Sequence, residues 1–131
     1  MKKFIFLLLF IPFFGTAQKT PKVSVKKLNG FATIYSDRFV GLRTSTGEIF
    51  KHTNLTAASN FFKMNTWVKI TNLNNKKTVI VRINDRMHPR MARMGRVVDL
   101  TKAAAKRLGN FDGITRVKVE VLKEPVASAK L

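Results

Sequence analysis

The chain contains no cysteine, and its 131 residues include only two histidines and seven acidic side chains. We therefore expect no disulfide scaffold, no thiolate metal site, no cysteine nucleophile and no lipid-modified cysteine anchor. Two histidines are too few for a histidine-rich metal site, so we expect no metal site. The length allows one domain and leaves little room for a second, and the 45% hydrophobic content is too high for a wholly disordered chain.

The first residues have the layout of a secretory signal peptide. Two lysines form a short positive region, residues 4–14 are apolar, and small residues follow up to Ala17. A membrane-spanning helix needs about 20 apolar residues, so this run is too short. We expect residues 1–17 to be cleaved before Gln18, which places the mature chain in the periplasm or outside the cell. The alternative is an N-terminal membrane anchor that stays attached.

Positive charge dominates the remaining composition. The chain has 25 lysines and arginines against 7 acidic residues, a formal net charge of +18 at pH 7. Such a chain attracts polyanions. In the cytoplasm the default polyanion is nucleic acid. After secretion, the candidates are peptidoglycan carboxylates, lipopolysaccharide and anionic membrane surfaces.

Short alternating segments and polar loops indicate an all-β domain with one short helix. The helix is expected over residues 100–108, with Asp99 or Thr101 as its N-cap and Gly109 just past its end. This content favours a small β-barrel over a sandwich or an α/β sheet. The expected strands are 30–35, 67–71, 78–83, 97–98 and 114–122. The other expected segments are a basic linker at 18–29, a helical turn at 56–58, a hairpin loop at 72–77, a basic loop at 87–96 and a flexible tail at 123–131.

A series of ordered motifs resembles the double-psi β-barrel domain of the rare lipoprotein A (RlpA) family. The motifs are 30–32 with Tyr35, 44–50, 55–58, 68–75, 79–86 and 98–105. The resemblance covers residues 30–122 and implies a six-stranded double-psi barrel. It also implies lytic transglycosylase activity on the glycan strands of peptidoglycan, preferably strands stripped of stem peptides, without a cofactor. Expansins share this barrel, and several of them bind polysaccharide without cutting it, so the fold does not establish activity.

The same resemblance assigns catalytic carboxylates to this chain. Asp85 ends the strongest predicted strand and matches the essential aspartate of the family's Asn-Asp-Arg motif, which implies a general acid and base. Glu48 matches a second, supporting carboxylate. From the residues alone, Asp85 could equally cap a turn or pair with a neighbouring arginine, and Glu48 could simply be solvated. The residues expected to contact substrate are Asn84, Arg86, Ser59, Arg82 and Tyr35.

The sequence departs from the family pattern in two places near these residues. Ser59 stands where the family has a site histidine, and a serine hydroxyl cannot change its charge near neutral pH. His52 and His88 are the only possible replacements. The loop at 87–96 is about three residues longer than usual and carries three arginines. It could hold muramic acid carboxylates, or it could be a solvated basic loop whose methionines pack on the barrel.

Three functions are compatible with these observations. The first is a secreted, monomeric lytic transglycosylase that acts on peptidoglycan glycan strands. The second is a non-catalytic, expansin-like module that binds cell-wall polysaccharide. The third, a nucleic-acid-binding barrel, rests on charge alone, and the signal peptide argues against nucleic acid as the partner.

Overall fold

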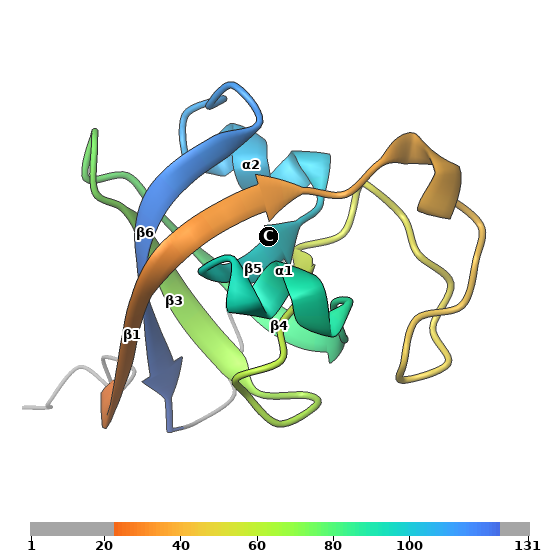
Figure 1. Cartoon of the computed structure of the whole chain (residues 1–131), viewed down its shortest axis with the longest axis horizontal. Coiled ribbons are helices and arrows are strands. Elements are labelled where there is room, and N and C mark those ends of the chain that lie inside the picture. Colours follow the sequence, from red (N-terminus) through yellow and green to blue (C-terminus); the bar gives the residue numbers. More distant parts are fainter. Residues whose placement is uncertain (1–22, 124–131) are drawn as a thin grey trace, which may run out of the picture.

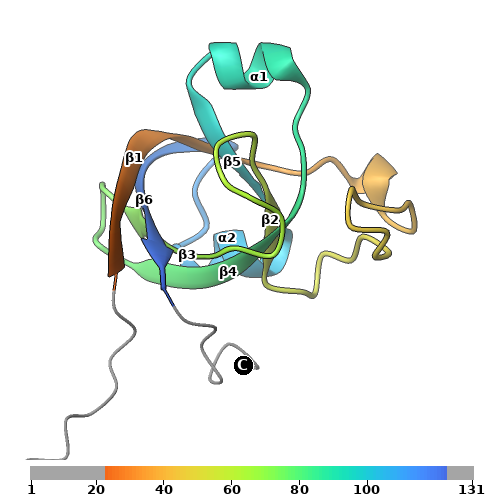
Figure 2. The ribbon, with the colours of Figure 1, turned by 90° about the horizontal axis from the view of Figure 1, so that it is seen from below.

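The computed structural model describes residues 23–123, which form a six-stranded closed barrel (Figures 1 and 2). Around the barrel the strands follow the order β1-β5-β2-β4-β3-β6. The pairs β1/β5 and β2/β4 are parallel and the others are antiparallel. The strands are β1 (Val23–Ile34), β2 (Thr56–Ala58), β3 (Trp67–Asn72), β4 (Thr78–Asp85), β5 (Arg96–Leu100) and β6 (Ile114–Leu122). The expected six-stranded double-psi barrel is therefore confirmed.

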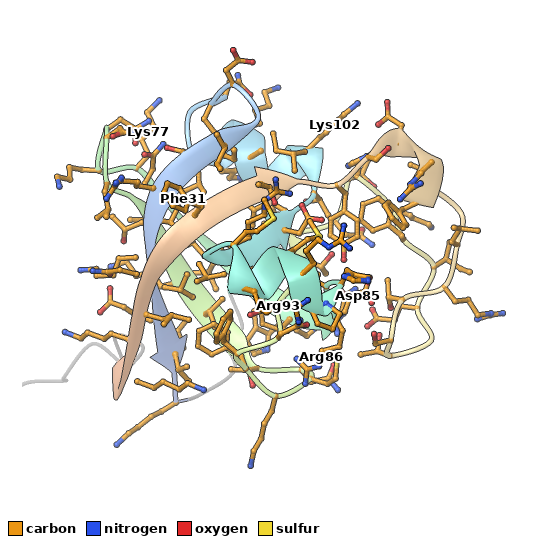
Figure 3. The ribbon with its side chains drawn as sticks, in the orientation of Figure 1. Phe31, Lys77, Asp85, Arg86, Arg93 and Lys102 are labelled. Atoms are coloured by element: carbon orange, nitrogen blue, oxygen red, sulfur yellow. The ribbon has the colours of Figure 1, made fainter. Side chains whose placement is uncertain are left out.

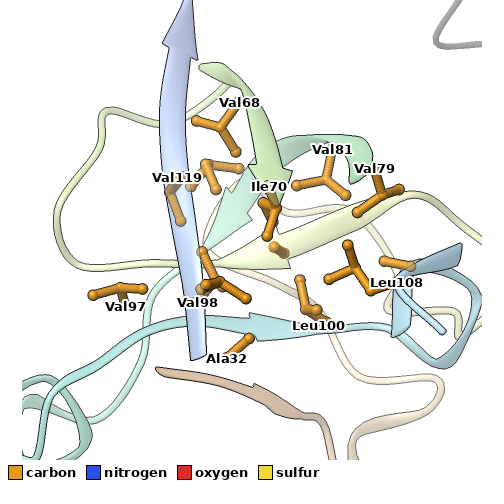
Figure 4. Packing of buried hydrophobic residues seen from close by; sticks show 14 of the residues in the cluster. Ala32, Val68, Ile70, Val79, Val81, Val97, Val98, Leu100, Leu108 and Val119 are labelled. Atoms are coloured by element: carbon orange, nitrogen blue, oxygen red, sulfur yellow. The ribbon is translucent and has the colours of Figure 1, made fainter. Parts of the chain in front are cut away.

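The barrel interior is filled by side chains that point inward from alternate positions along the strands. β3 alternates between half-buried and buried positions, and its inward residues are Val68, Ile70 and Asn72. Valines dominate the cluster in Figure 4, because β-branched side chains pack well on a pleated surface. Ala104 of helix α2 (Lys102–Arg107) and the C-cap residue Leu108 are part of the same core.

Helix α2 is capped at both ends by side chains. The Thr101 hydroxyl accepts the Ala104 N–H at 3.2 Å, which makes Thr101 the N-cap. At the other end, the Asn72 and Asn75 amides from the β3–β4 turn each donate to the Leu108 carbonyl at 2.9 Å. The asparagine-rich hairpin loop is confirmed, and it also binds the end of the helix. Asp99 does not cap the helix and belongs to β5.

Three sequence-based expectations are wrong. β1 begins at Val23, so residues 23–29 of the expected linker are strand, paired with β6. Residues 56–58 form β2 and not a helical turn, because they pair with both β4 and β5. The expected basic loop at 87–96 contains an unexpected helix, α1 (Pro89–Arg93). A short 3₁₀ helix at Asp37–Phe39 follows β1. The expected signal peptide, residues 18–22 of the linker and residues 124–131 of the tail lie outside the described residues.

No helix within residues 23–123 combines the length and the apolar character that crossing a bilayer requires.

Candidate active site

Asp85 lies at the end of β4, where a β-bulge changes the pairing with β2. Ala57 pairs with Ile83, whereas the next residue, Ala58, pairs with Asp85, so Asn84 is skipped. The bulge buries both Ile83 and Asn84 and leaves Asp85 half-buried. Bulges commonly re-aim a side chain beside an active site. Here the bulge places the carboxyl at the surface beside α1 and the 36–54 loop (Figure 3).

Four donors hold the Asp85 carboxylate. The Tyr35 hydroxyl donates to Oδ2 at 2.7 Å. The Ser45 hydroxyl and backbone N–H donate to Oδ1 at 2.8 and 2.9 Å, and the Arg86 N–H also donates to Oδ1 at 2.9 Å. No salt bridge to Asp85 is formed within the described part of the chain. The alternative of an arginine-paired Asp85 is therefore wrong, and the carboxylate is oriented by neutral groups.

Tyr35 is a positioning residue and does not present its ring to substrate. Only 6% of the residue is exposed. The ring stacks on Phe50 with centroids 4.2 Å apart and meets Phe39 edge to face. Burial and the hydrogen bond to Asp85 raise the pKa of Tyr35 well above its usual value, so the hydroxyl remains a donor. Its expected role as a substrate contact is replaced by orientation of Asp85.

Glu48 is bound to Arg82 and is not free to transfer protons. Arg82 donates to both carboxylate oxygens, at 2.7 and 2.5 Å, and the Thr46 hydroxyl donates at 2.7 Å. These bonds, with another from Asn84, lower the pKa of Glu48 to about 2, the Arg82 bond having the largest effect. A carboxyl this acidic does not act as a general acid near neutral pH. Glu48 and Arg82 together fix the loop that carries Ser45.

We expect a Glu48→Gln variant to lose about 1 kcal/mol of unfolding free energy at pH 7. Arg82 would lose its charged partner while its side chain is only 23% exposed, but solvent at the 41% exposed Glu48 side chain limits the loss. Because the pKa of Glu48 is lowered, the pair stabilises the fold fully above pH 4.5, and this contribution disappears as the pH falls towards 2. Denaturant unfolding of the unmodified protein and of Glu48→Gln at pH 7 and pH 3 measures this contribution. A stability difference that does not shrink at pH 3 would contradict the assignment.

Ser59 and Asn84, two expected substrate contacts, are buried. Ser59 is 0% exposed, and its hydroxyl donates to the Val97 carbonyl at 2.7 Å and accepts the Phe61 N–H at 3.1 Å. In this structure the Ser59 hydroxyl joins two backbone segments and is not exposed for substrate contact. Asn84 is 3% exposed and hydrogen-bonds Glu48, so it supports the site from inside.

Arg86 is exposed, but its guanidinium is engaged with the backbone. It donates to the carbonyls of Ser59 and Phe62 and so fixes the segment that follows β2. Arg82 is likewise bound to Glu48. Both arginines therefore shape the site, and neither neutralises Asp85.

Asp99 joins the candidate site in the structure, although the sequence did not indicate it. Ala58 pairs with Asp85 on β4 and with Asp99 on β5, so the two carboxyls flank the same β2 residue. Asp99 is 8% exposed and accepts the Thr33 hydroxyl at 3.1 Å. Burial raises the pKa of Asp99 to about 6, and the charge of Asp85 adds to this effect. The available signal was an aspartate within a run of buried apolar strand residues.

Both histidines are engaged within the fold. The Nδ1 atom of His52 accepts the Lys102 N–H at 3.1 Å, and its Nε2 lies 3.0 Å from Asp37. The Nδ1 atom of His88 accepts the Arg90 N–H at 3.1 Å and caps α1. Among the described residues, no group of three or more histidine, aspartate or glutamate side chains is placed to hold a metal ion.

Comparison with known proteins identifies relatives over most of the chain. The family model described as "Lytic transglycolase" matches residues 27–121. The chain is 37% identical over 107 residues to the endolytic peptidoglycan transglycosylase RlpA of Pasteurella multocida, covering 81% of this chain and 35% of that protein. It is 43% identical over 95 residues to the Pseudomonas aeruginosa protein of the same name, covering 72% of this chain and 27% of that protein. The chain thus spans about a third or less of the length of these relatives.

Two solved structures share the fold at low sequence identity. Streptomyces papain inhibitor superposes with a TM-score of 0.59 at 18% identity, covering 76% of this chain and 96% of that one. The expansin of Clavibacter michiganensis also gives a TM-score of 0.59, at 21% identity, covering 78% of this chain and 53% of that one. At these identities the similarity concerns the barrel alone.

Proposed function

The chain belongs to the lytic transglycolase family and has its RlpA-like double-psi β-barrel, and from this membership we propose that it is a peptidoglycan lytic transglycosylase. The observation that carries the proposal is the Asp85 carboxylate, which is half-buried, oriented by Tyr35 and Ser45, and paired with no arginine guanidinium among the described residues. Its substrate is the glycan strand of peptidoglycan, preferably stripped of stem peptides. The protein works as a monomer in the periplasm or outside the cell.

Asp85 acts first as the acid and then as the base. In its protonated form it donates a proton to the glycosidic oxygen that links muramic acid to the next sugar, and the bond from the anomeric carbon to that oxygen breaks. The 6-hydroxyl of the same muramic acid attacks the anomeric carbon and gives its proton to the Asp85 carboxylate. The product is a 1,6-anhydro sugar, and no water is consumed. Because the nucleophile is intramolecular, its high effective concentration comes with the substrate.

Asp99 takes the supporting role that the sequence assigned to Glu48. The transition state of glycosidic cleavage resembles an oxocarbenium ion and carries positive charge. A second carboxylate across β2 from Asp85 stabilises that charge, and a weakly solvated carboxylate does so more strongly than one in water. Because burial raises the pKa of Asp99 to about 6, its carboxyl is mostly ionised at neutral pH and mostly protonated at pH 5.

The proposal is tested by the products of the reaction. Mature protein, from Gln18 to Leu131, is incubated with amidase-stripped glycan strands, and mass spectrometry follows the strand ends. We expect new 1,6-anhydromuramic ends to accumulate with time. New reducing ends without the anhydro form would identify a hydrolase, and unchanged strands would rule out cleavage of this substrate.

A second candidate is a non-catalytic module that binds the cell wall. It is favoured by Ser59, which stands at the family's histidine position with a fully buried hydroxyl. This alternative gives salt-sensitive binding to purified sacculi without any fall in the turbidity of the suspension. A falling turbidity supports cleavage instead.

A further inference from the structure

Helix α1 is attached beside Asp85 by Met91 and by Met87, which precedes the helix. Met87 and Met91 pack with Tyr35, Phe50 and Ala58 in a small core of their own, separate from the barrel interior. Tyr35 in turn donates its hydroxyl to Asp85. Because the same side chain contacts both, α1 has a defined position next to the carboxylate (Figure 3).

Both ends of α1 are fixed as well. At the start, His88 is the N-cap and Pro89 occupies the first turn, where its missing N–H costs nothing. At the end, the Gly95 carbonyl accepts the Phe31 N–H of β1 at 2.9 Å, and Gly95 has a φ of +84°, which favours glycine. The helix is therefore a preorganised part of the site and not a solvated loop.

The outer surface of α1 carries two arginines that the fold does not use. Arg90 and Arg93 are exposed, and neither forms an ion pair with any of the described residues. By contrast, the guanidinium groups of Arg82 and Arg86 are bound within the protein. Residues three apart in a helix are neighbours on its surface. No acidic residue occurs between Arg86 and Val98, so two adjacent guanidinium groups lack a counter-charge within this segment.

We propose that Arg90 and Arg93 bind carboxylate groups of the glycan strand that lies across Asp85, an inference that rests on the proposed function. The planar guanidinium matches a carboxylate with two parallel hydrogen bonds. A peptidoglycan strand carries carboxylates from two sources. In stripped strands it is the lactyl group of muramic acid, and in intact strands it is the stem peptide. Either source gives the strand a charged handle beside the scissile bond, which neutral polysaccharides lack.

Binding measurements with a non-cleaving protein test this subsite independently of catalysis. In an Asp85→Asn background, Arg90→Gln/Arg93→Gln is compared with Lys76→Gln/Lys77→Gln. The control removes the same two charges from the exposed β3–β4 turn, which Figure 3 shows far from Asp85. The ligands are stripped glycan strands, peptide-bearing strands and uncharged chitin oligomers.

We expect the arginine variant to bind at least one carboxylate-bearing strand about tenfold more weakly for each arginine removed. Chitin binding should stay unchanged, and the lysine control should change strand binding less than twofold. Weakening confined to stripped strands would identify the lactyl carboxylate, and weakening confined to peptide-bearing strands would identify the stem peptide. An Arg90→Lys/Arg93→Lys variant should recover only part of the loss, because lysine keeps the charge but cannot form the two parallel hydrogen bonds of a guanidinium.

The proposal is overturned if the lysine control weakens binding as much as the arginine variant, because net charge alone would then explain the effect. It is also overturned if chitin binding falls equally. A protein that binds strands through Arg90 and Arg93 but never releases anhydro ends would retain the subsite and refute only the lytic activity.

Discussion

An Asp85→Asn variant should release 1,6-anhydromuramic ends at least about a thousandfold more slowly than the unmodified protein, within the range expected for a lost general acid and base. The asparagine oxygen can still accept from Ser45 and from the Arg86 N–H, and its amide can donate to the Tyr35 oxygen. The fold should therefore be retained while proton transfer is lost. Mass spectrometry of the strand ends and circular dichroism of the variant measure both.

The matched control is Asp112→Asn, which makes the same chemical change at an exposed position between α2 and β6. This variant should cleave strands at the unmodified rate. If Asp85→Asn keeps more than a tenth of the activity, Asp85 does not transfer the proton, and the mechanism proposed above fails. Loss of activity together with loss of the circular dichroism signal would mean that Asp85 is required for folding, and Asp85→Ser would then separate the two effects.

At pH 8, an Asp99→Asn variant should have a higher free energy of unfolding than the unmodified protein. Burial raises the pKa of Asp99 from 3.8 to about 6, so the folded state binds its proton more tightly than the unfolded state does. The resulting stability is present below pH 4 and is lost as the pH rises through 6. Removing the charge therefore raises the free energy of unfolding by about 3 kcal/mol above pH 6, and it changes this free energy very little at pH 4. The Asn Oδ1 can still accept the Thr33 hydroxyl.

The same variant should be about a hundredfold less active at pH 8, a loss typical of removing one electrostatic group from an active site. In the unmodified protein, ionisation of Asp99 should contribute a rise in rate as the pH passes through about 6. In Asp99→Asn this contribution should be absent. Measured pH–rate profiles and denaturant unfolding at pH 4 and pH 8 test the two parts of the prediction.

Higher stability combined with lower activity would show that Asp99 is held in an unfavourable environment for function. A variant that loses stability and activity together at pH 8 would instead show a structural role. Asp112→Asn again serves as the control, since an exposed carboxylate should change neither quantity by much.

The sequence located β3, β4 and β6 well because their patterns are local. β3, β4 and β6 alternate between inward and outward side chains, and their positions were expected within a residue or two. β2 was missed because it has only three residues and two are alanine, which favours helices. It is a strand because β4 and β5 bond to it from both sides.

Helix α1 was also missed, although its signals were present. Pro89 stands at the first position, and the methionines at 87 and 91 are four residues apart. A helix of five residues is too short for periodicity to identify it. The methionines face inward only because Tyr35 and Phe50, from distant segments, provide the surface on which they pack.

The sequence by itself determined the barrel, through strand periodicity and ordered motifs, and it located Asp85 at the end of the strongest strand. Only the tertiary structure decided the chemistry around that carboxyl. Arg82 pairs with Glu48, 34 positions away, and leaves Asp85 to Tyr35 and Ser45. Barrel closure likewise buries Asp99 on β5, across β2 from Asp85. Strand periodicity is a local property of the chain, whereas the charge state of a carboxyl depends on solvent and partners that only the folded barrel brings together.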